Sequence, residues 1–238
     1  MSRSSGSGTV ETVPVKRFPD PKQAGPEGLV ALGGDLHPRS LLLAYRQGIF
    51  PWPIEGLPLT WFCPAERAIL DFADLKIPRS LVKLQRRAPY RLTIDAAFGA
   101  VIEDCAAARR PDPDGSGSGT WITAEMRRAY CDFHRLGHAH SVEAWDGKQL
   151  AGGLYGVDVD GAFVGESMFY HQPNASKLAL LHLIEHLSRR RLDWIDVQVM
   201  SPHLAAFGAK LIDRDCFLKR LAETRSRGLK LFYWGGFS

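Results

Sequence analysis

The chain has 238 residues, of which 45% are hydrophobic, enough to bury a full core in one domain or in one domain plus a small lobe. The chain has 30 Lys and Arg residues and 26 Asp and Glu residues, a mildly basic balance that permits contact with an anionic partner such as RNA. Strong nucleic-acid binders usually have a larger excess of positive charge. The four cysteines lack metal-ligand spacing, and no apolar run matches a membrane span or a signal core, so we expect reduced thiols in a cytoplasmic protein.

We expect residues 1–65 to form a small N-terminal α+β domain, with a disordered Ser/Gly-rich start at residues 1–8. Its clear helix spans residues 38–47, because Pro38 suits a first helical turn and Gly48 ends the pattern. The aromatic stretch that follows carries Pro51 and Pro53, which exclude a helix or a central strand.

Residues 66–238 then form the larger domain. Its first half predicts helices over residues 79–87, over 95–107 with Asp95 as N-cap, and from Thr123 as N-cap to Gly137. The Gly- and Ser-rich segment 112–119 predicts a flexible loop between the last two helices.

From residue 141 the pattern changes to short strands. Asp146-Gly147 predicts a hairpin between strands 141–145 and 149–157, and Asp160-Gly161 predicts a turn into strand 162–170. The expected elements after it are an amphipathic helix over 175–190, a strand over 194–200, a short helix, a strand over 210–212 and a helix over 215–225. This order indicates an α+β fold with a mixed sheet flanked by helices.

Two of these strands carry polar side chains where a buried strand normally has apolar ones. Asp196 and Gln198 share a face of their strand because side chains alternate, and Glu166 lies on the earlier strand. If the strands are neighbours, the three side chains converge and have the chemistry to orient an amine and accept its proton. Spacing alone leaves a catalytic cleft and a structural polar network equally open.

Two histidine patterns suggest metal binding. His182 and His186 match the inverted zinc-protease pattern H-x-x-E-H, but they lie opposite the apolar stripe of their helix, so we favour a solvated face over a zinc peptidase. His134, His138 and His140 surround a helix end, where capping or solvation is favoured over metal.

The turn before the helix at residue 175 offers a further site. Asn174 is a good N-cap, and free N–H groups at a helix start suit a phosphate or a carbonyl. Strand, turn and helix here are similar to the CoA-dependent N-acetyltransferases, but residues 171–177 contain no glycine for close approach to a pyrophosphate. CoA-dependent acetyl transfer therefore stays an alternative only.

Eight blocks of the chain, in order, resemble one family, the bacterial leucyl/phenylalanyl-tRNA–protein transferases. The blocks are 33–36 (GGDL), 45–52 (YRQGIFPW), 119–123 (GTWIT), 139–143 (AHSVE), 152–156 (GGLYG), 165–169 (GESMF), 174–177 (NASK) and 195–198 (IDVQ). The resemblance implies an N-acetyltransferase-like domain behind a smaller N-terminal domain. It also implies transfer of leucine or phenylalanine from tRNA to proteins with N-terminal Arg or Lys, which marks them for degradation.

The resemblance implies no metal, nucleotide or CoA, because the aminoacyl ester is already activated, and we expect a monomer. It gives Asp196 and Gln198 a role in assisting the acceptor amine and places Glu166 near the acceptor and the terminal adenosine. Trp52, Trp121, Asn174 and Ser176 match positions for adenosine or acceptor binding. The aminoacyl side-chain pocket is matched by Leu154, Phe163, Met168, Leu180, Leu183, Leu187 and Ile195, which by their type alone are ordinary core residues.

The chain departs from the family pattern at several positions. Val197 replaces a common cysteine, and Leu183 and Leu187 are aliphatic where aromatic rings are frequent. A wider pocket predicts that phenylalanine or methionine is accepted at least as readily as leucine. Whether Asp196 and Gln198 transfer protons or only position substrates, with the tRNA ribose hydroxyl moving the proton, is open from the sequence. The basic clusters 83–87 and 189–191 are candidates for phosphate contact or simply solvated faces.

Overall fold

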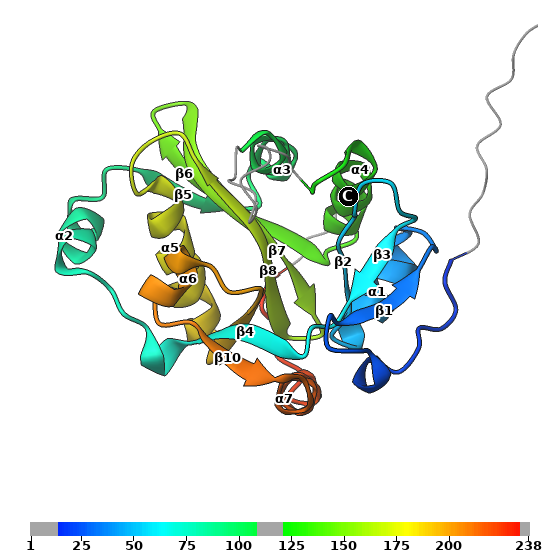
Figure 1. The fold of residues 1–238 in the computed structure, drawn as a ribbon. Helices are drawn as coiled ribbons and strands as arrows, with labels where there is room; N and C mark the ends of the chain where they lie inside the picture. The colour runs from blue at the N-terminus through cyan, green and yellow to red at the C-terminus, as the bar shows by residue number, and fades with distance from the viewer. Residues whose placement is uncertain (1–13, 109–120, 234–238) are drawn as a thin grey trace, which may run out of the picture.

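A computed structural model describes residues 14–108 and 121–233, so the expected tail at 1–8 and the expected loop at 112–119 lie outside the described residues. The N-terminal part, blue to cyan in Figure 1, holds a three-stranded antiparallel sheet in the order β1-β3-β2. The strands are β1 (Leu29–Leu32), β2 (Phe50–Pro51) and β3 (Thr60–Phe62). Helix α1 (Pro38–Arg46) begins with its proline in the first turn, as expected.

A seven-stranded sheet forms the rest of the protein, in the order β10-β4-β9-β8-β7-β6-β5. The strands are β4 (Glu66–Asp71), β5 (Arg91–Ile94), β6 (Ala139–Asp146), β7 (Gln149–Val159), β8 (Ala162–Tyr170), β9 (Trp194–Gln198) and β10 (Lys210–Asp213). All neighbours are antiparallel except β8 and β9, which run parallel and share the single register pair Val164↔Asp196. The predicted mixed α+β fold is confirmed.

Helices cover both faces of this sheet (Figure 1). The helices after α1 are α2 (Arg79–Arg87), which stands at one end of the molecule, α3 (Phe98–Ala107), α4 (Ala124–Arg135), α5 (Ala175–Arg189), α6 (Pro202–Ala206) and α7 (Arg214–Ser226). The described residues also include the 3-10 turns η1 (Pro21–Gln23) and η2 (Phe72–Asp74). Side chains of α1, α3 and α4 share one core cluster, and those of α5 and α7 share another with β9. No helix in the described ranges is long and apolar enough to cross a membrane.

The predicted turns hold in the structure with small shifts. Asp160 and Gly161 connect β7 to β8 with φ of 51° and 94°, the positive values that a tight hairpin turn requires. The loop between β6 and β7 is Gly147-Lys148, one residue later than expected, because Asp146 pairs with Gln149.

Three local predictions are wrong. Asp95 does not cap α3, which starts at Phe98, because its carboxylate instead accepts a hydrogen bond from the Ser141 backbone N–H. Asn174 has φ of 65° and makes no side-chain cap bond to α5. The strand expected to reach residue 200 ends at Gln198, where φ of 61° breaks the extended backbone.

Candidate active site

Glu166, half-buried on β8, collects neutral hydrogen-bond donors from three different elements. Its Oε1 accepts from the Tyr45 hydroxyl of α1 and from Nε2 of Gln198 on β9, each at 2.7 Å. Its Oε2 lies 3.3 Å from the Tyr130 hydroxyl of α4, and the two tyrosine hydroxyls also contact each other. Burial raises the pKa of Glu166 to about 7, against the lowering effect of these hydrogen bonds. This carboxyl group therefore exchanges its proton near neutral pH.

Asp196 of β9 has a different partner, the guanidinium of Arg67 on β4. Nε and Nη2 of Arg67 donate to its two oxygens at 2.8 and 2.7 Å, and both side chains are 1% exposed. Such a bidentate pair fixes the carboxylate in orientation as well as in charge.

Arg67 is itself held from several sides. Its Nη1 donates to the Gly48 carbonyl at 3.2 Å, and its guanidinium lies 4.5 Å from the ring centroids of Phe50 and Phe217. Burial lowers the pKa of this guanidinium, but the charge of Asp196 and its hydrogen bonds, together with smaller contributions from Cys63 and Glu166, raise the pKa overall. Each member of this buried pair is therefore enclosed together with its counter-charge.

Gln198 links the two carboxylates. Its backbone N–H donates to Oδ1 of Asp196 at 2.9 Å, and its side-chain amide reaches Glu166. The positive φ at Gln198 turns the chain at this point, so that backbone and side chain serve different acids. The three polar residues singled out in the sequence are therefore brought together, although Asp196 joins through the backbone of Gln198.

The aromatic residues predicted for adenosine or acceptor contact also meet. Trp52 and Trp121 stack with ring centroids 5.1 Å apart and an interplanar angle of 12°, and both are half-buried. Ser176 is buried at the start of α5, where a side chain added at Gly152 would come within 2.9 Å of its backbone nitrogen. Asn174 precedes it and is half-buried.

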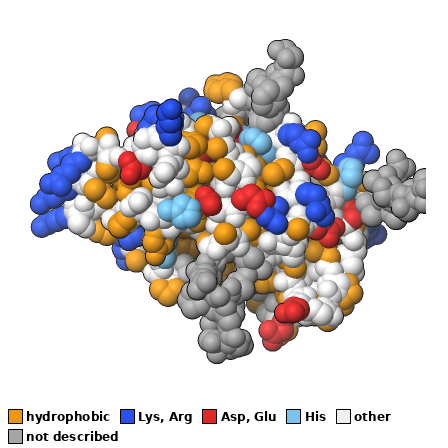
Figure 2. Space-filling view, turned by 90° about the horizontal axis from the view of Figure 1, so that it is seen from above, with side chains coloured by type: hydrophobic (Ala, Val, Ile, Leu, Met, Phe, Trp, Pro, Cys, Tyr) orange, Lys and Arg blue, Asp and Glu red, His pale blue; other side chains and the backbone are white. Residues whose placement is uncertain are grey.

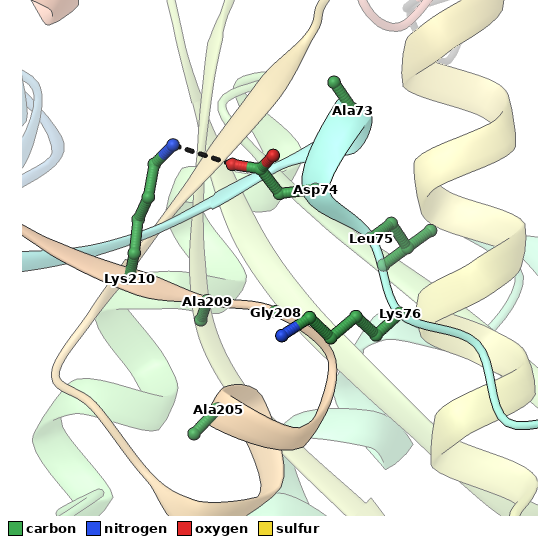
Figure 3. A pocket seen from close by; sticks show the side chains of 8 residues that line it. All are labelled: Ala73, Asp74, Leu75, Lys76, Ala205, Gly208, Ala209 and Lys210. Atoms are coloured by element: carbon green, nitrogen blue, oxygen red, sulfur yellow. Dashed lines mark hydrogen bonds and ion pairs between the residues drawn. The ribbon is translucent and has the colours of Figure 1, made fainter.

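The seven residues predicted for the aminoacyl pocket belong to one hydrophobic cluster. Six are buried and Met168 is half-buried; the buried ones are Leu154, Phe163, Leu180, Leu183, Leu187 and Ile195. A cavity of about 420 Å³ opens between η2 and the α6–β10 turn, and none of these seven residues lines it (Figure 3). It carries the ion pair of Lys210 with Asp74.

The histidines differ from the solvated faces that were expected. His140 is 2% exposed, with Nδ1 2.7 Å from Asp95, and its ring stacks on Phe232. His186 Nε2 lies 2.9 Å from the Leu231 carbonyl, because the segment after α7 covers this side of α5. Within residues 14–108 and 121–233 no group of three His, Cys, Asp or Glu side chains is arranged to hold a metal.

Comparison with known proteins finds relatives that match most of the chain. The family model described as leucyl/phenylalanyl-tRNA protein transferase matches residues 69–222, and the model of its N-terminal domain matches residues 34–65. A leucyl/phenylalanyl-tRNA–protein transferase of Anaeromyxobacter dehalogenans is 52% identical over 206 residues, 87% of each chain. Proteins of the same name from Shewanella denitrificans and Shewanella frigidimarina are 47% and 46% identical over 209 and 219 residues, at least 87% of each chain. The chain belongs to the leucyl/phenylalanyl-tRNA–protein transferase family.

For this transferase family member, sequence reasoning missed three residues that build the site, namely Tyr45, Arg67 and Tyr130. Arg67 gave a usable signal, because a charged residue beside the apolar run Ala68-Ile69-Leu70 is as unexpected in a strand as Asp196 is. Tyr45 and Tyr130 gave none, since a tyrosine on an apolar helix face is ordinary core until its hydroxyl has a partner.

Proposed function

We propose that this chain moves leucine or phenylalanine from an aminoacyl-tRNA onto the N-terminal amine of an acceptor protein. Family membership over most of the chain supports this reaction class and disfavours the CoA-dependent alternative. The observation that carries the proposal is Glu166, a half-buried carboxylate with a pKa of about 7 in contact with Gln198. Aminolysis of an ester needs such a proton acceptor beside the attacking amine.

In the proposed reaction the neutral α-amine attacks the ester carbonyl carbon, a C–N bond forms and the bond to the ribose oxygen breaks. Glu166 takes the proton from the amine and then gives it to the departing ribose oxygen, which leaves as a hydroxyl and returns Glu166 to the carboxylate. Gln198 orients the amine, and Asp196 acts by positioning Gln198, because its own oxygens are already held by Arg67.

The finer assignments are part of the same proposal. The acceptor begins with Arg or Lys, the modified protein is marked for degradation, and the enzyme works as a cytoplasmic monomer divided at residue 65. The hydrophobic cluster at Leu183 and Leu187 takes the aminoacyl side chain after rearranging, and the stacked Trp52 and Trp121 lie along the adenosine or the acceptor. Asn174 and Ser176 contribute at the start of α5.

The tRNA body lies over basic surface in this proposal. Four exposed cationic side chains lie on α2, at the end of the molecule where Lys and Arg gather in Figure 2; they are Arg79, Lys83, Arg86 and Arg87. The second basic cluster follows α5 at residues 189–191, where Arg189 is already paired with Glu185. Cationic side chains of this kind favour a phosphate backbone without specifying its sequence.

One assay tests the function. The protein is incubated with leucyl-tRNA and a peptide that begins with Arg, with and without a chelator, and leucylation of the peptide is measured. Transfer in both conditions is expected. No transfer, or transfer that the chelator abolishes, contradicts the proposal, and a matched peptide with a blocked N-terminus serves as the control.

A further inference from the structure

We propose that Tyr45 and Tyr130 are positioning residues for the transfer step, whose hydroxyls keep Glu166 oriented and ionised so that it accepts the proton of the acceptor amine. This inference rests on the proposed function. It starts from the fact that both phenols are fully enclosed in the protein, yet direct their polar ends at one carboxylate. A packing role alone is served by phenylalanine, which fills the same space without a hydroxyl.

The surroundings of Glu166 explain why donors are needed. It faces Tyr45 from α1, Tyr130 from α4, Gln198 and Asp196 from β9, and beyond them Arg67 from β4. Desolvation and the Asp196 charge both favour the protonated carboxyl group, whereas the three hydrogen bonds favour the carboxylate. Without the hydroxyls, burial prevails and Glu166 already holds a proton when the amine arrives.

The two hydroxyls are not equivalent. Each phenol has one hydrogen, and three contacts exist among Tyr45, Tyr130 and Glu166. Tyr45 donates to Glu166 at 2.7 Å, so the contact between the tyrosines requires Tyr130 as its donor, and the longer contact of 3.3 Å competes for the same hydrogen. Tyr45 is therefore the main donor to the carboxylate, and Tyr130 holds the Tyr45 oxygen in place.

The phenols stay neutral during this step. Burial and the nearby Glu166 charge raise the pKa of Tyr45 and of Tyr130 well above the ordinary tyrosine value. The proton from the amine is thus transferred to a Glu166 oxygen as the C–N bond forms, and no phenolate is created. Glu166 then gives this proton to the departing ribose oxygen, so the carboxylate is restored and the bond to the ribose oxygen breaks with a hydroxyl as the leaving group.

The experiment titrates Glu166 directly, without substrate. Protein labelled with 13C in the glutamate carboxyl groups is followed by NMR from pH 4 to 10, and Glu166→Gln identifies the resonance. Wild type is compared with Tyr45→Phe, Tyr130→Phe and the double variant. The control is Thr224→Val, which removes a buried hydroxyl that accepts from Trp194 Nε1 at 2.9 Å in a different part of the core.

The titration midpoint of the Glu166 carboxyl group is expected to rise by about half a pH unit or more in Tyr45→Phe, by less in Tyr130→Phe and by most in the double variant. The reason is that a hydrogen bond to a charged carboxylate is stronger than one to the neutral acid, so its loss favours protonation. Thr224→Val is expected to leave it unchanged. A midpoint in the double variant equal to that of wild type overturns the inference.

A second readout uses leucyl transfer at pH 6.5 and pH 8.5. The rate of Tyr45→Phe relative to wild type is expected to be at least about twofold lower at the acidic pH than at the basic pH, because the protonated fraction of Glu166 is larger there. The protonation of the acceptor amine cancels in this ratio. An equal loss at both pH values indicates a structural role and overturns the inference, whereas no transfer by wild type overturns the proposed function instead.

Discussion

Glu166 and Asp196 are carboxylates on neighbouring strands, and the same turn at Gln198 touches both, yet their environments differ in kind. Asp196 faces a guanidinium that neutralises it and occupies both of its oxygens. Glu166 faces phenol hydroxyls and an amide, which stabilise a negative charge without cancelling it. One carboxyl group is held in an ion pair and the other, with a pKa of about 7, is able to exchange a proton near neutral pH, so the environment gives two carboxyl groups different properties.

The largest expected effect comes from breaking the ion pair between Arg67 and Asp196. Arg67→Met leaves Asp196 buried without a counter-charge, so we expect the free energy of unfolding to fall by about 3–5 kcal/mol. Urea denaturation at pH 7 measures it. The double variant Arg67→Met with Asp196→Asn is expected to recover much of this loss, because no lone charge remains; a single variant within about 1 kcal/mol of wild type would show that the pair is unimportant.

The next effect separates the two acids by rate. Glu166→Gln removes the proton acceptor, and we expect the leucyl transfer rate to fall by about 10²–10⁴-fold at pH 8. Single-turnover transfer to an Arg-initiated peptide measures the step. Thr224→Val is the control, and a rate within threefold of wild type for Glu166→Gln rejects the assignment.

Asp196→Asn tests whether the charge of Asp196 influences the pKa of Glu166. The Asp196 charge is one of the causes that raise the pKa of Glu166, so its removal beside the remaining Arg67 cation lowers that pKa. We expect the 13C midpoint of Glu166 to move toward acid, opposite to the shift in Tyr45→Phe. A shift toward base in Asp196→Asn contradicts the electrostatic account.

A smaller effect concerns stability. The pKa of Glu166 is about 7 in the folded protein against an ordinary value of 4.5, so the folded state binds more protons between these limits and loses stability as pH rises through them. Glu166→Gln lacks this dependence. The melting temperature of Glu166→Gln relative to wild type should therefore be higher at pH 8 than at pH 5, and a constant difference would mean that the acid titrates normally.

The smallest effect concerns the selectivity between leucine and phenylalanine, to which neither acid contributes in the proposal. Leu183→Phe adds a ring to the hydrophobic cluster proposed for the aminoacyl side chain. We expect the ratio of phenylalanyl to leucyl transfer to fall by about tenfold, since pocket volume discriminates apolar groups only modestly. Competition between the two charged tRNAs measures the ratio; an unchanged ratio places the pocket elsewhere.

The sequence predicted the acids but not their environments, for physical reasons. Strand alternation placed Asp196 and Gln198, since a period of two is a strong local signal. The contacts around the two acids join residues that are far apart in the sequence. Tyr45 and Tyr130, like Arg67 and Asp196, are at least 85 positions apart. Contacts of that kind are set by the topology of the fold and leave no local pattern. Strand β4 was missed altogether, although it lies between β9 and β10 in the sheet and carries Arg67.

The prediction for the histidines of α5 missed a contact from another part of the chain. His182 and His186 were assigned to solvent because the apolar stripe of their helix points elsewhere, but the segment ending at Phe232 lies over that face. Local periodicity reports one neighbour of a helix at most, so it missed the chain segment that contacts His186, although Glu185 and Arg189 on the same face are exposed as expected.

The cage around the Arg67 guanidinium has a consequence for biosynthesis. Its walls come from Gly48 and Phe50, which precede Arg67 in the chain, and from Phe217, which is made later than Asp196. A ribosome delivers these parts in order, so a nascent chain has the Asp196 acid without a complete cage until α7 has emerged. The ion pair is therefore enclosed only after α7 has been synthesised, and a product truncated before α7 carries Arg67 and Asp196 without the Phe217 ring beside them.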